Sequence, residues 1–231
     1  MSGAKYSFVV LLSLFLILPF GGCKKPPKPK TPESAMNEEV KNGNSGDETA
    51  KGKIPRKYGI KSGYVEMDVK NNFINVPIKS NIYFDKYGDL EMTEEKSEME
   101  MMGQKIITHT RRITRDGFIY TIDMIKKTGT KVKINSFAEL NSFDFSKYSE
   151  DILKKWNIKI LPEATVLDKK CKVTSFESST MKGTVYVWQG INLNSEISIS
   201  GMEMKSKATK LETNIPVKKD LFEVPAGIKI L

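Results

Sequence analysis

The chain has 231 residues and a formal net charge of +9, and it contains two cysteines and one histidine. Its basic residues are spread along the sequence and are not interleaved with aromatic residues, so the charge does not predict nucleic-acid binding. The cysteines and the histidine form no zinc-binding pattern. We therefore expect no nucleic-acid partner, no metal and no cofactor.

Residues 1–22 have the pattern of an export signal. Lys5 is the only charge in residues 1–7, and residues 8–20 are apolar apart from Ser13 and Pro19. As a helix this apolar run would be about 20 Å long, which is too short for a hydrocarbon core of about 30 Å. A short basic segment, an apolar run of this length and small residues at its end are typical of a cleaved signal. A buried N-terminal helix is the alternative.

Cys23 follows two glycines, and Phe20-Gly21-Gly22-Cys23 resembles the lipobox of bacterial lipoproteins. In that family the signal is cut before the cysteine, which is then acylated. The resemblance therefore implies that Cys23 is lipidated and anchors the chain to a membrane, although Phe20 stands where the family prefers leucine. Acyl chains at about 0.8 kcal/mol per buried methylene can hold a domain at a bilayer without a spanning helix. Ordinary secretory cleavage with a free cysteine is the alternative.

Residues 23–53 are predicted to be the lipidated cysteine and a disordered tether. The segment is rich in lysine, proline, glutamate, asparagine and glycine, a composition that cannot bury enough apolar surface to fold. Its lysines either approach anionic headgroups or keep the tether solvated. In bacterial lipoproteins the residue after the cysteine influences sorting. Lys24 is not the aspartate of inner-membrane retention in some bacteria, so the resemblance favours the outer membrane of a bacterial envelope.

Residues 54–231 are predicted to form one mainly β (α+β) domain. Apolar and polar residues alternate in residues 63–72, 73–92, 104–134, 169–178, 183–200 and 203–214. Turn signals at Gly88-Asp89, Asp116-Gly117, Thr128-Gly129, Gly183, Gly190 and Gly201 separate these runs. Strands that follow one another through short turns predict an antiparallel meander.

One segment, residues 144–156, has a helical period. Tyr148, Ile152, Leu153 and Trp156 would lie on one helical face, with Ser146 or Ser149 as the N-cap. One principal helix cannot cover eight or more strands. We therefore expect a curved antiparallel sheet, or incomplete β-barrel, with this helix packed in or across its concave side. Either the sheet curls into a half-barrel around the helix, or part of its concave side is left for a ligand.

Four segments, residues 58–69, 82–91, 166–177 and 220–230, follow the order seen in uncharacterised bacterial envelope lipoproteins that resemble the LolA-like lipoprotein-carrier superfamily. The resemblance covers nearly all of the domain. It implies a half-barrel whose apolar hollow holds acyl chains, and it carries over no catalytic residue. Carriers of this superfamily are soluble, so a lipid-anchored chain suits a receptor, sensor or static binder better than a shuttle.

The sequence offers little for catalysis, and we expect no enzyme. His109 shares a predicted strand face with Ile107 and Arg111, and no serine or cysteine with a patterned acid can be assigned to it. A Ser-His-Asp site is recognised by geometry and is therefore left open, but a strand-face histidine is the preferred interpretation. Cys171 is interpreted as a small buried hydrophobic residue, with a reactive or partner-linked thiol as the alternative.

Methionines cluster in residues 91–103 and 201–205, where Met99 and Met101 share a strand face, as do Met202 and Met204. Thioethers can bind Cu(I), but methionine more often fills cores or lines adaptable apolar surfaces. The candidate cavity residues are Met99, Met101, Tyr148, Ile152, Trp156 and Trp188.

We therefore expect a membrane-anchored, monomeric envelope lipoprotein that binds an acyl chain, a lipid or a lipoprotein in the hollow of a half-barrel. The alternative is a structural or partner-binding lipoprotein whose core is filled by its own side chains. An empty apolar cavity beneath the helix would distinguish the two.

Overall fold

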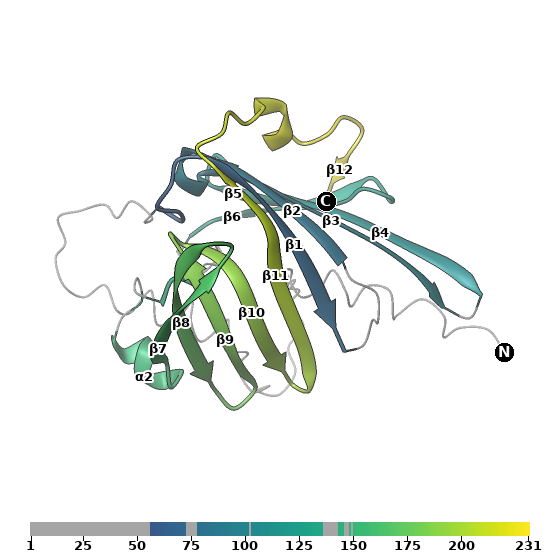
Figure 1. Ribbon diagram of the computed structural model, residues 1–231. Helices are drawn as coiled ribbons and strands as arrows, with labels where there is room; N and C mark the ends of the chain where they lie inside the picture. Colours follow the sequence, from purple (N-terminus) through teal and green to yellow (C-terminus); the bar gives the residue numbers. More distant parts are fainter. Residues whose placement is uncertain (1–55, 73–77, 102, 136–142, 146–147, 149) are drawn as a thin grey trace. The chain divides into compact units, whose positions relative to one another are not determined.

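The computed structural model describes residues 56–72, 78–101, 103–135, 143–145, 148 and 150–231. These residues form a single 12-stranded open sheet with the strand order β12-β6-β5-β4-β3-β2-β1-β11-β10-β9-β8-β7 (Figure 1). The described helical elements are short, so the protein is mainly β, as the sequence predicts.

The strands are β1 (Gly63–Asn71), β2 (Ile78–Asp85), β3 (Leu90–Met101), β4 (Gln104–Arg115), β5 (Phe118–Asp123), β6 (Thr128–Lys133), β7 (Lys159–Val166), β8 (Lys169–Glu177), β9 (Met181–Trp188), β10 (Ile191–Ile199), β11 (Met202–Thr213) and β12 (Lys229–Ile230). The helical elements are η3 (Lys86–Gly88), α2 (Glu150–Lys155) and η6 (Lys219–Phe222).

The sheet consists of two antiparallel meanders, β1–β6 and β7–β11, which meet where β11 pairs with β1. The two-residue strand β12 runs parallel to β6 and is the exception to the antiparallel order. The predicted meander is therefore confirmed. Turns lie at Gly117, Gly190 and Gly201, all with positive φ, as the sequence predicts.

Two of the predicted turn glycines lie inside strands instead. Gly129 belongs to β6 and Gly183 to β9. A Cβ atom on Gly183 would come within 2.7 Å of the Glu196 backbone oxygen, and one on Gly129 within 2.9 Å of the Thr121 oxygen. These glycines permit close approach of neighbouring strands, which is the other reason for glycine in a strand.

The predicted principal helix over residues 144–156 is wrong, because α2 has only six residues. It ends in a Schellman motif: the amide of Ile158 donates to the Leu153 carbonyl, and that of Asn157 donates to the Lys154 carbonyl. Asn157 has a φ of 44°, the left-handed conformation that this motif requires. The predicted caps Ser146 and Ser149 lie outside the described residues.

Directly paired residues on antiparallel strands lie on the same face of a sheet. The register therefore places Met67, Met99, Met181, Met202 and Met204 on one face, which we call the methionine face. We call the opposite face the C-terminal face, because C-terminal residues pack on it.

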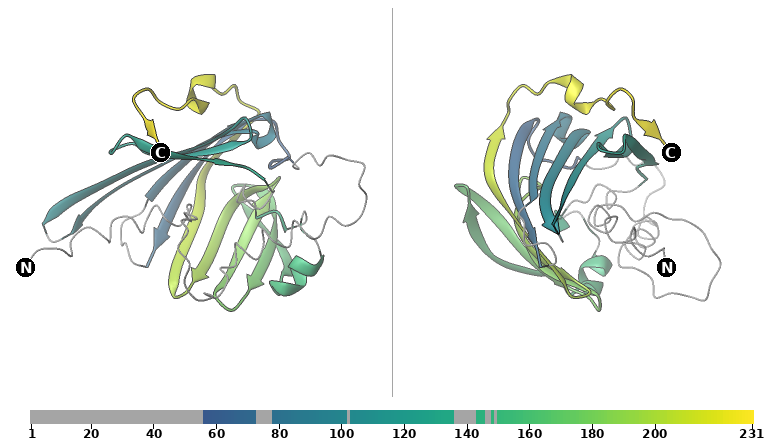
Figure 2. Two further views of the ribbon diagram at one scale, coloured as in Figure 1. Left: turned by 180° about the vertical axis from the view of Figure 1, so that it is seen from behind. Right: turned by 90° about the vertical axis from the view of Figure 1, so that its right-hand side faces the viewer.

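On the C-terminal face, Met92, Ile113 and Ile122 form a buried cluster with Phe222 of η6. Val217, Leu221, Val224 and Ile228 of the same segment pack against this cluster. The segment that contains η6 runs over β2–β5 to reach β12 (Figure 2). The C-terminal segment therefore covers β2–β5 around Met92, Ile113 and Ile122 on this face.

The buried apolar residues of the described chain extend from Tyr58 to Phe222. On the methionine face they form one cluster around Val65, Met67 and Phe84, and another around Phe176, Val185 and Ile197. All of these residues lie within the domain predicted over residues 54–231.

Candidate functional site

Methionines from β1, β3, β9 and β11 lie on the methionine face. Met67 is buried, whereas Met99, Met181, Met202 and Met204 are half-buried. Met204 lies opposite Ile197, and Met202 and Met181 both lie opposite Ile199. The predicted face-sharing of Met202 and Met204 is confirmed. Met101 ends β3, but its side chain lies outside the described part.

The described cover of the methionine face over β8–β10 is an aromatic cluster. Trp156 is 4% exposed and packs in one cluster with Phe176 and Phe145. The ring centroid of Phe176 lies 6.2 Å from that of Trp156 and 5.6 Å from that of Phe145. Tyr148 packs against this cluster and also against Ile134, which follows β6. Burial and the nearby Asp144 raise the pKa of Tyr148 to about 12, so it is neutral at pH 7.

The six predicted cavity residues do not all lie together. Tyr148 and Trp156 share the aromatic cluster, whereas Trp188 packs in the cluster around Val65. Met99 lies on β3, at the other meander. Ile152 belongs to α2, and the structure describes nothing of its side chain.

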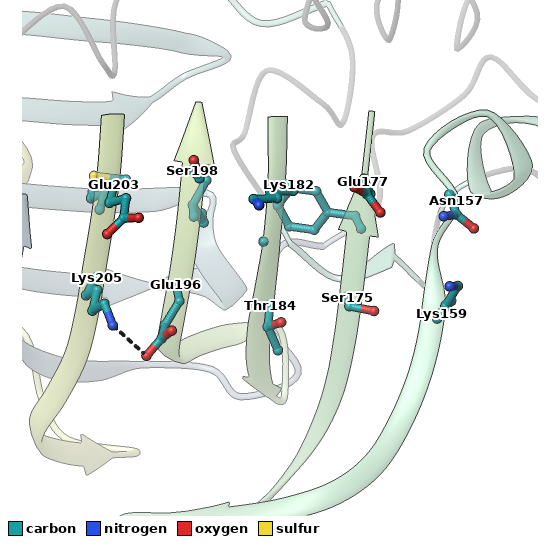
Figure 3. Close-up of a pocket in the computed structure, with 14 residues that line it drawn as sticks. Asn157, Lys159, Ser175, Glu177, Lys182, Thr184, Glu196, Ser198, Glu203 and Lys205 are labelled. Atoms are coloured by element: carbon teal, nitrogen blue, oxygen red, sulfur yellow. Dashed lines mark hydrogen bonds and ion pairs between the residues drawn. The ribbon is translucent and has the colours of Figure 1, made fainter. Parts of the chain in front are cut away.

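A groove of about 510 Å³ lies across β8–β11. Figure 3 shows its polar residues in two rows, which cross the strands through directly paired positions except at Asn157, which precedes β7. One row is Lys205, Glu196, Thr184, Ser175 and Lys159, and the other is Glu203, Ser198, Lys182, Glu177 and Asn157. These positions alternate along the strands with Val185 and Ile197, so they face away from the methionine face.

This groove is not the apolar hollow that the sequence predicts. Its lysines and glutamates balance, and Lys205 and Glu196 form an ion pair at 3.3 Å with both side chains 61% exposed. Exposed pairs of this kind contribute little binding or stability, because water and salt screen them. The groove has the character of a solvated sheet surface.

A buried ion cluster joins the start of the described domain to β3. Lys57 Nζ lies 2.7 Å from Glu91 Oε2, and the Tyr58 hydroxyl donates to the same oxygen at 2.6 Å. Burial would raise the pKa of Glu91, but Lys57 and Arg112 outweigh it and lower that pKa. Burial lowers the pKa of Lys57 and raises that of Tyr58 well above its usual value. The cluster fixes the point where residues 56–58 enter the fold.

His109 is engaged with charged neighbours. Its Nε2 lies 2.8 Å from Glu94, which also accepts a hydrogen bond from Arg111 at 2.9 Å. Burial would raise the pKa of Glu94, but these hydrogen bonds outweigh it and lower the pKa to about 2. His109, Ile107 and Arg111 share a face of β4, as predicted, and His109 belongs to a structural ion network.

Cys171 is fully buried in the cluster around Val65, which confirms its interpretation as a small hydrophobic residue. Burial raises the pKa of its thiol, so the thiolate is disfavoured. Cys23 and the predicted tether lie outside the described residues. Within the described ranges, no helix has the length and hydrophobicity needed to span a membrane, and no three histidine, cysteine or acidic side chains group as metal ligands.

No family model matches the chain. Over 122 residues it is 30% identical to uncharacterized protein MJ0687 of Methanocaldococcus jannaschii, which corresponds to 48% of this chain and 35% of that protein. The chain thus spans about a third of the length of this curated relative.

Several solved structures have a similar fold. An uncharacterized conserved protein from Thermus thermophilus has a TM-score of 0.47 at 7% identity, over 85% of this chain and 96% of that one. The MucA/MucB complex of Pseudomonas aeruginosa has a TM-score of 0.45 at 14% identity, and the match covers 74% of this chain and 58% of that one. A LolA superfamily protein from Nitrosomonas europaea has a TM-score of 0.36 at 6% identity, and the match covers 74% of this chain and 92% of that one. Identities this low relate the chains by fold alone.

Proposed function

We propose that this protein is a lipid-anchored envelope protein that binds a flexible apolar ligand, such as the acyl chain of a lipid or lipoprotein, on its methionine face. The observation that carries the proposal is that five methionines from four strands lie on that face, four of them half-buried. Methionine is unbranched and polarisable, so a surface lined with it adapts to ligands of variable shape.

The position of these methionines in the sheet supports the proposal. The aromatic cluster of Trp156 packs over β8–β10, whereas Met99 lies on β3 and Met202 and Met204 lie on β11. A half-buried apolar side chain has not gained the full transfer free energy, which is about 25 cal/mol per Å² of buried apolar area. An acyl chain bound against these residues would bury the rest of their apolar area and so gain the remaining transfer free energy.

The proposed anchor is the acylated Cys23, and the proposed location is the outer membrane of a bacterial envelope. Thirty residues separate Cys23 from Ile54. A flexible chain of that length has a mean end-to-end distance of about 30 Å, and it reaches roughly 100 Å when fully extended. Such a tether would allow a monomeric domain to reach ligands at the membrane and somewhat beyond it.

A second candidate function is that of a structural or protein-binding lipoprotein without a ligand. The observation that favours it is the burial of Trp156 and Phe176, which fill space beside the sheet with the chain's own side chains. The two functions differ in whether the methionine face takes up an added acyl chain.

Native mass spectrometry of residues 54–231, exported to a periplasm and purified gently, tests the proposal. We expect reproducible adducts at acyl-lipid masses. Met204→Glu should abolish them, whereas Lys205→Glu, on the same strand but the opposite face, should leave them unchanged. A clean apo mass with no uptake of added fatty acid or lipopeptide would exclude the ligand and favour the second function.

A further inference from the structure

We propose that the edge of the sheet formed by β7, together with the adjacent end of α2 and the turn into β8, is a contact surface for an anionic lipid bilayer. We call this region the β7 edge. β7 is the last strand in the described sheet order, and it pairs with β8 alone. The inference does not depend on a ligand at the methionine face.

Apolar side chains protrude at the β7 edge. Ile160 is 88% exposed, the largest exposed fraction among the large hydrophobic residues of the described chain. Its neighbour Leu161 is 36% exposed, and so is Leu167 in the turn that follows β7. Isolated exposed apolar residues are ordinary on protein surfaces. These three are distinguished by the charges around them.

Lysines flank these residues. Residues 154–172 contain six lysines and two acidic residues. Lys154 at the end of α2, Lys159 on β7 and Lys172 on β8 are exposed. Lys170 forms an ion pair with Glu163 at 3.3 Å, but its side chain is 81% exposed and such a pair is weak. Apolar side chains inserted among exposed lysines are suited to the interface of an anionic bilayer, where headgroups attract the lysines.

The edge is poorly suited to the main alternative, a protein strand that extends the sheet. The pairing of β7 with β8 is irregular between Leu161 and Ala164, and Pro162 within this interval has no amide hydrogen to donate. Prolines, bulges and charges are the features by which edge strands resist strand addition. Pairing with a second copy would also bring like-charged lysines together. A bilayer needs no ladder of hydrogen bonds, so it remains the partner that fits.

The proposed anchor would make this contact more effective. A domain already tethered to a membrane meets its surface at a high effective concentration, so a weak contact suffices to orient it. Contact through the β7 edge would fix which side of the sheet faces the lipid. The contact itself is measurable without the anchor, on the predicted domain of residues 54–231, once circular dichroism shows that this segment is folded.

Vesicle co-sedimentation of residues 54–231 tests the inference, with vesicles of phosphatidylcholine alone and of phosphatidylcholine mixed with phosphatidylglycerol. We expect binding to the mixed vesicles only, and weaker binding at high salt. Ile160→Glu should weaken it about tenfold, and Lys154→Gln and Lys159→Gln about fivefold each. Ile107→Glu is the matched control, because Ile107 is 52% exposed but lies on β4.

Binding that is equal on both vesicle types, or that responds alike to Ile160→Glu and Ile107→Glu, would overturn the inference. So would a dimer that depends on Ile160 and shows no vesicle binding, which would assign the β7 edge to a second copy. Ile160 is too exposed to contribute to the core, so circular dichroism should confirm that the Ile160→Glu variant is folded. Native mass spectrometry detects acyl adducts independently of vesicle binding. A negative co-sedimentation result therefore does not bear on the ligand proposed for the methionine face.

Discussion

The two faces of the sheet are completed in different ways. On the C-terminal face, Ile113 and Ile122 are fully buried, because Phe222 and neighbouring residues of the C-terminal segment pack over them. On the methionine face, four of the five methionines are half-buried. The cluster around Phe222 has the close packing of a finished core. The methionine face also holds buried residues such as Val65 and Val185, but beside them its half-buried methionines still have apolar area to bury, which is the property that a binding surface needs.

The largest predicted effect concerns the cluster around Phe222 on the C-terminal face. Phe222→Ala should lower the free energy of unfolding by about 3–5 kcal/mol, because it removes an aromatic ring from a packed cluster. Met204→Ala on the methionine face should cost less than about 1 kcal/mol, because that side chain is only half-buried. Urea denaturation of both variants measures the difference, and equal losses would remove the distinction between the faces.

The ion cluster at the start of the domain comes next. Glu91→Gln removes the carboxylate that pairs with the buried Lys57, so we expect a loss of about 3 kcal/mol in the free energy of unfolding. Tyr58→Phe removes only one hydrogen bond to Glu91 and should cost about 1–2 kcal/mol. Thermal unfolding of the two variants checks the order, and a reversed order would place the anchor of residues 56–58 elsewhere.

The acids of the sheet predict a pH dependence. The pKa of Glu94 is lowered to about 2 from its ordinary 4.5, so its contribution to stability is complete above pH 4.5 and is lost as the pH falls toward 2. The lowered pKa of Glu91 acts in the same direction. We expect Glu94 to account for about 1–2 kcal/mol, allowing for its partial exposure. Glu94→Gln should flatten the pH profile over this range, and an unchanged profile would contradict the network.

The smallest effect concerns the end of α2. Asn157 adopts a left-handed conformation, which costs most residues about 1–2 kcal/mol. Asn157→Ala should therefore destabilise the fold by about 1 kcal/mol, whereas Asn157→Gly should have almost no effect. Chemical denaturation compares the two. An equal loss in both would mean that the asparagine side chain matters rather than the backbone conformation.

The sequence predicted the β class and most strands, because alternation and turn glycines are local signals. It misplaced Gly129 and Gly183, whose role is to admit the backbone of a neighbouring strand and therefore depends on the register. It missed β7, in which Pro162 and an irregular pairing interrupt the alternation. The helix was predicted too long at its start, because Tyr148 fits the apolar period but lies before α2, which begins at Glu150.

The candidate site was predictable in part. The pairing of Met202 and Met204 on one face follows from alternation, but their convergence with Met67 and Met181 requires the strand order. Lys57 and Glu91 are 34 residues apart, and no local pattern links them. Cys171 could be predicted as buried, because it alternates with lysines and shares a predicted strand face with Val173.

The most direct test of the central claim is a titration of residues 54–231 with a fatty acid, followed by the methyl resonances of the methionines in NMR spectra. We predict that the resonances of Met99, Met181, Met202 and Met204 shift on binding, while those of Met92 and Met124, which pack on the C-terminal face, stay unchanged. Shifts confined to Met92 and Met124, or no shifts at any fatty-acid concentration, would contradict the assignment of the methionine face as the binding surface.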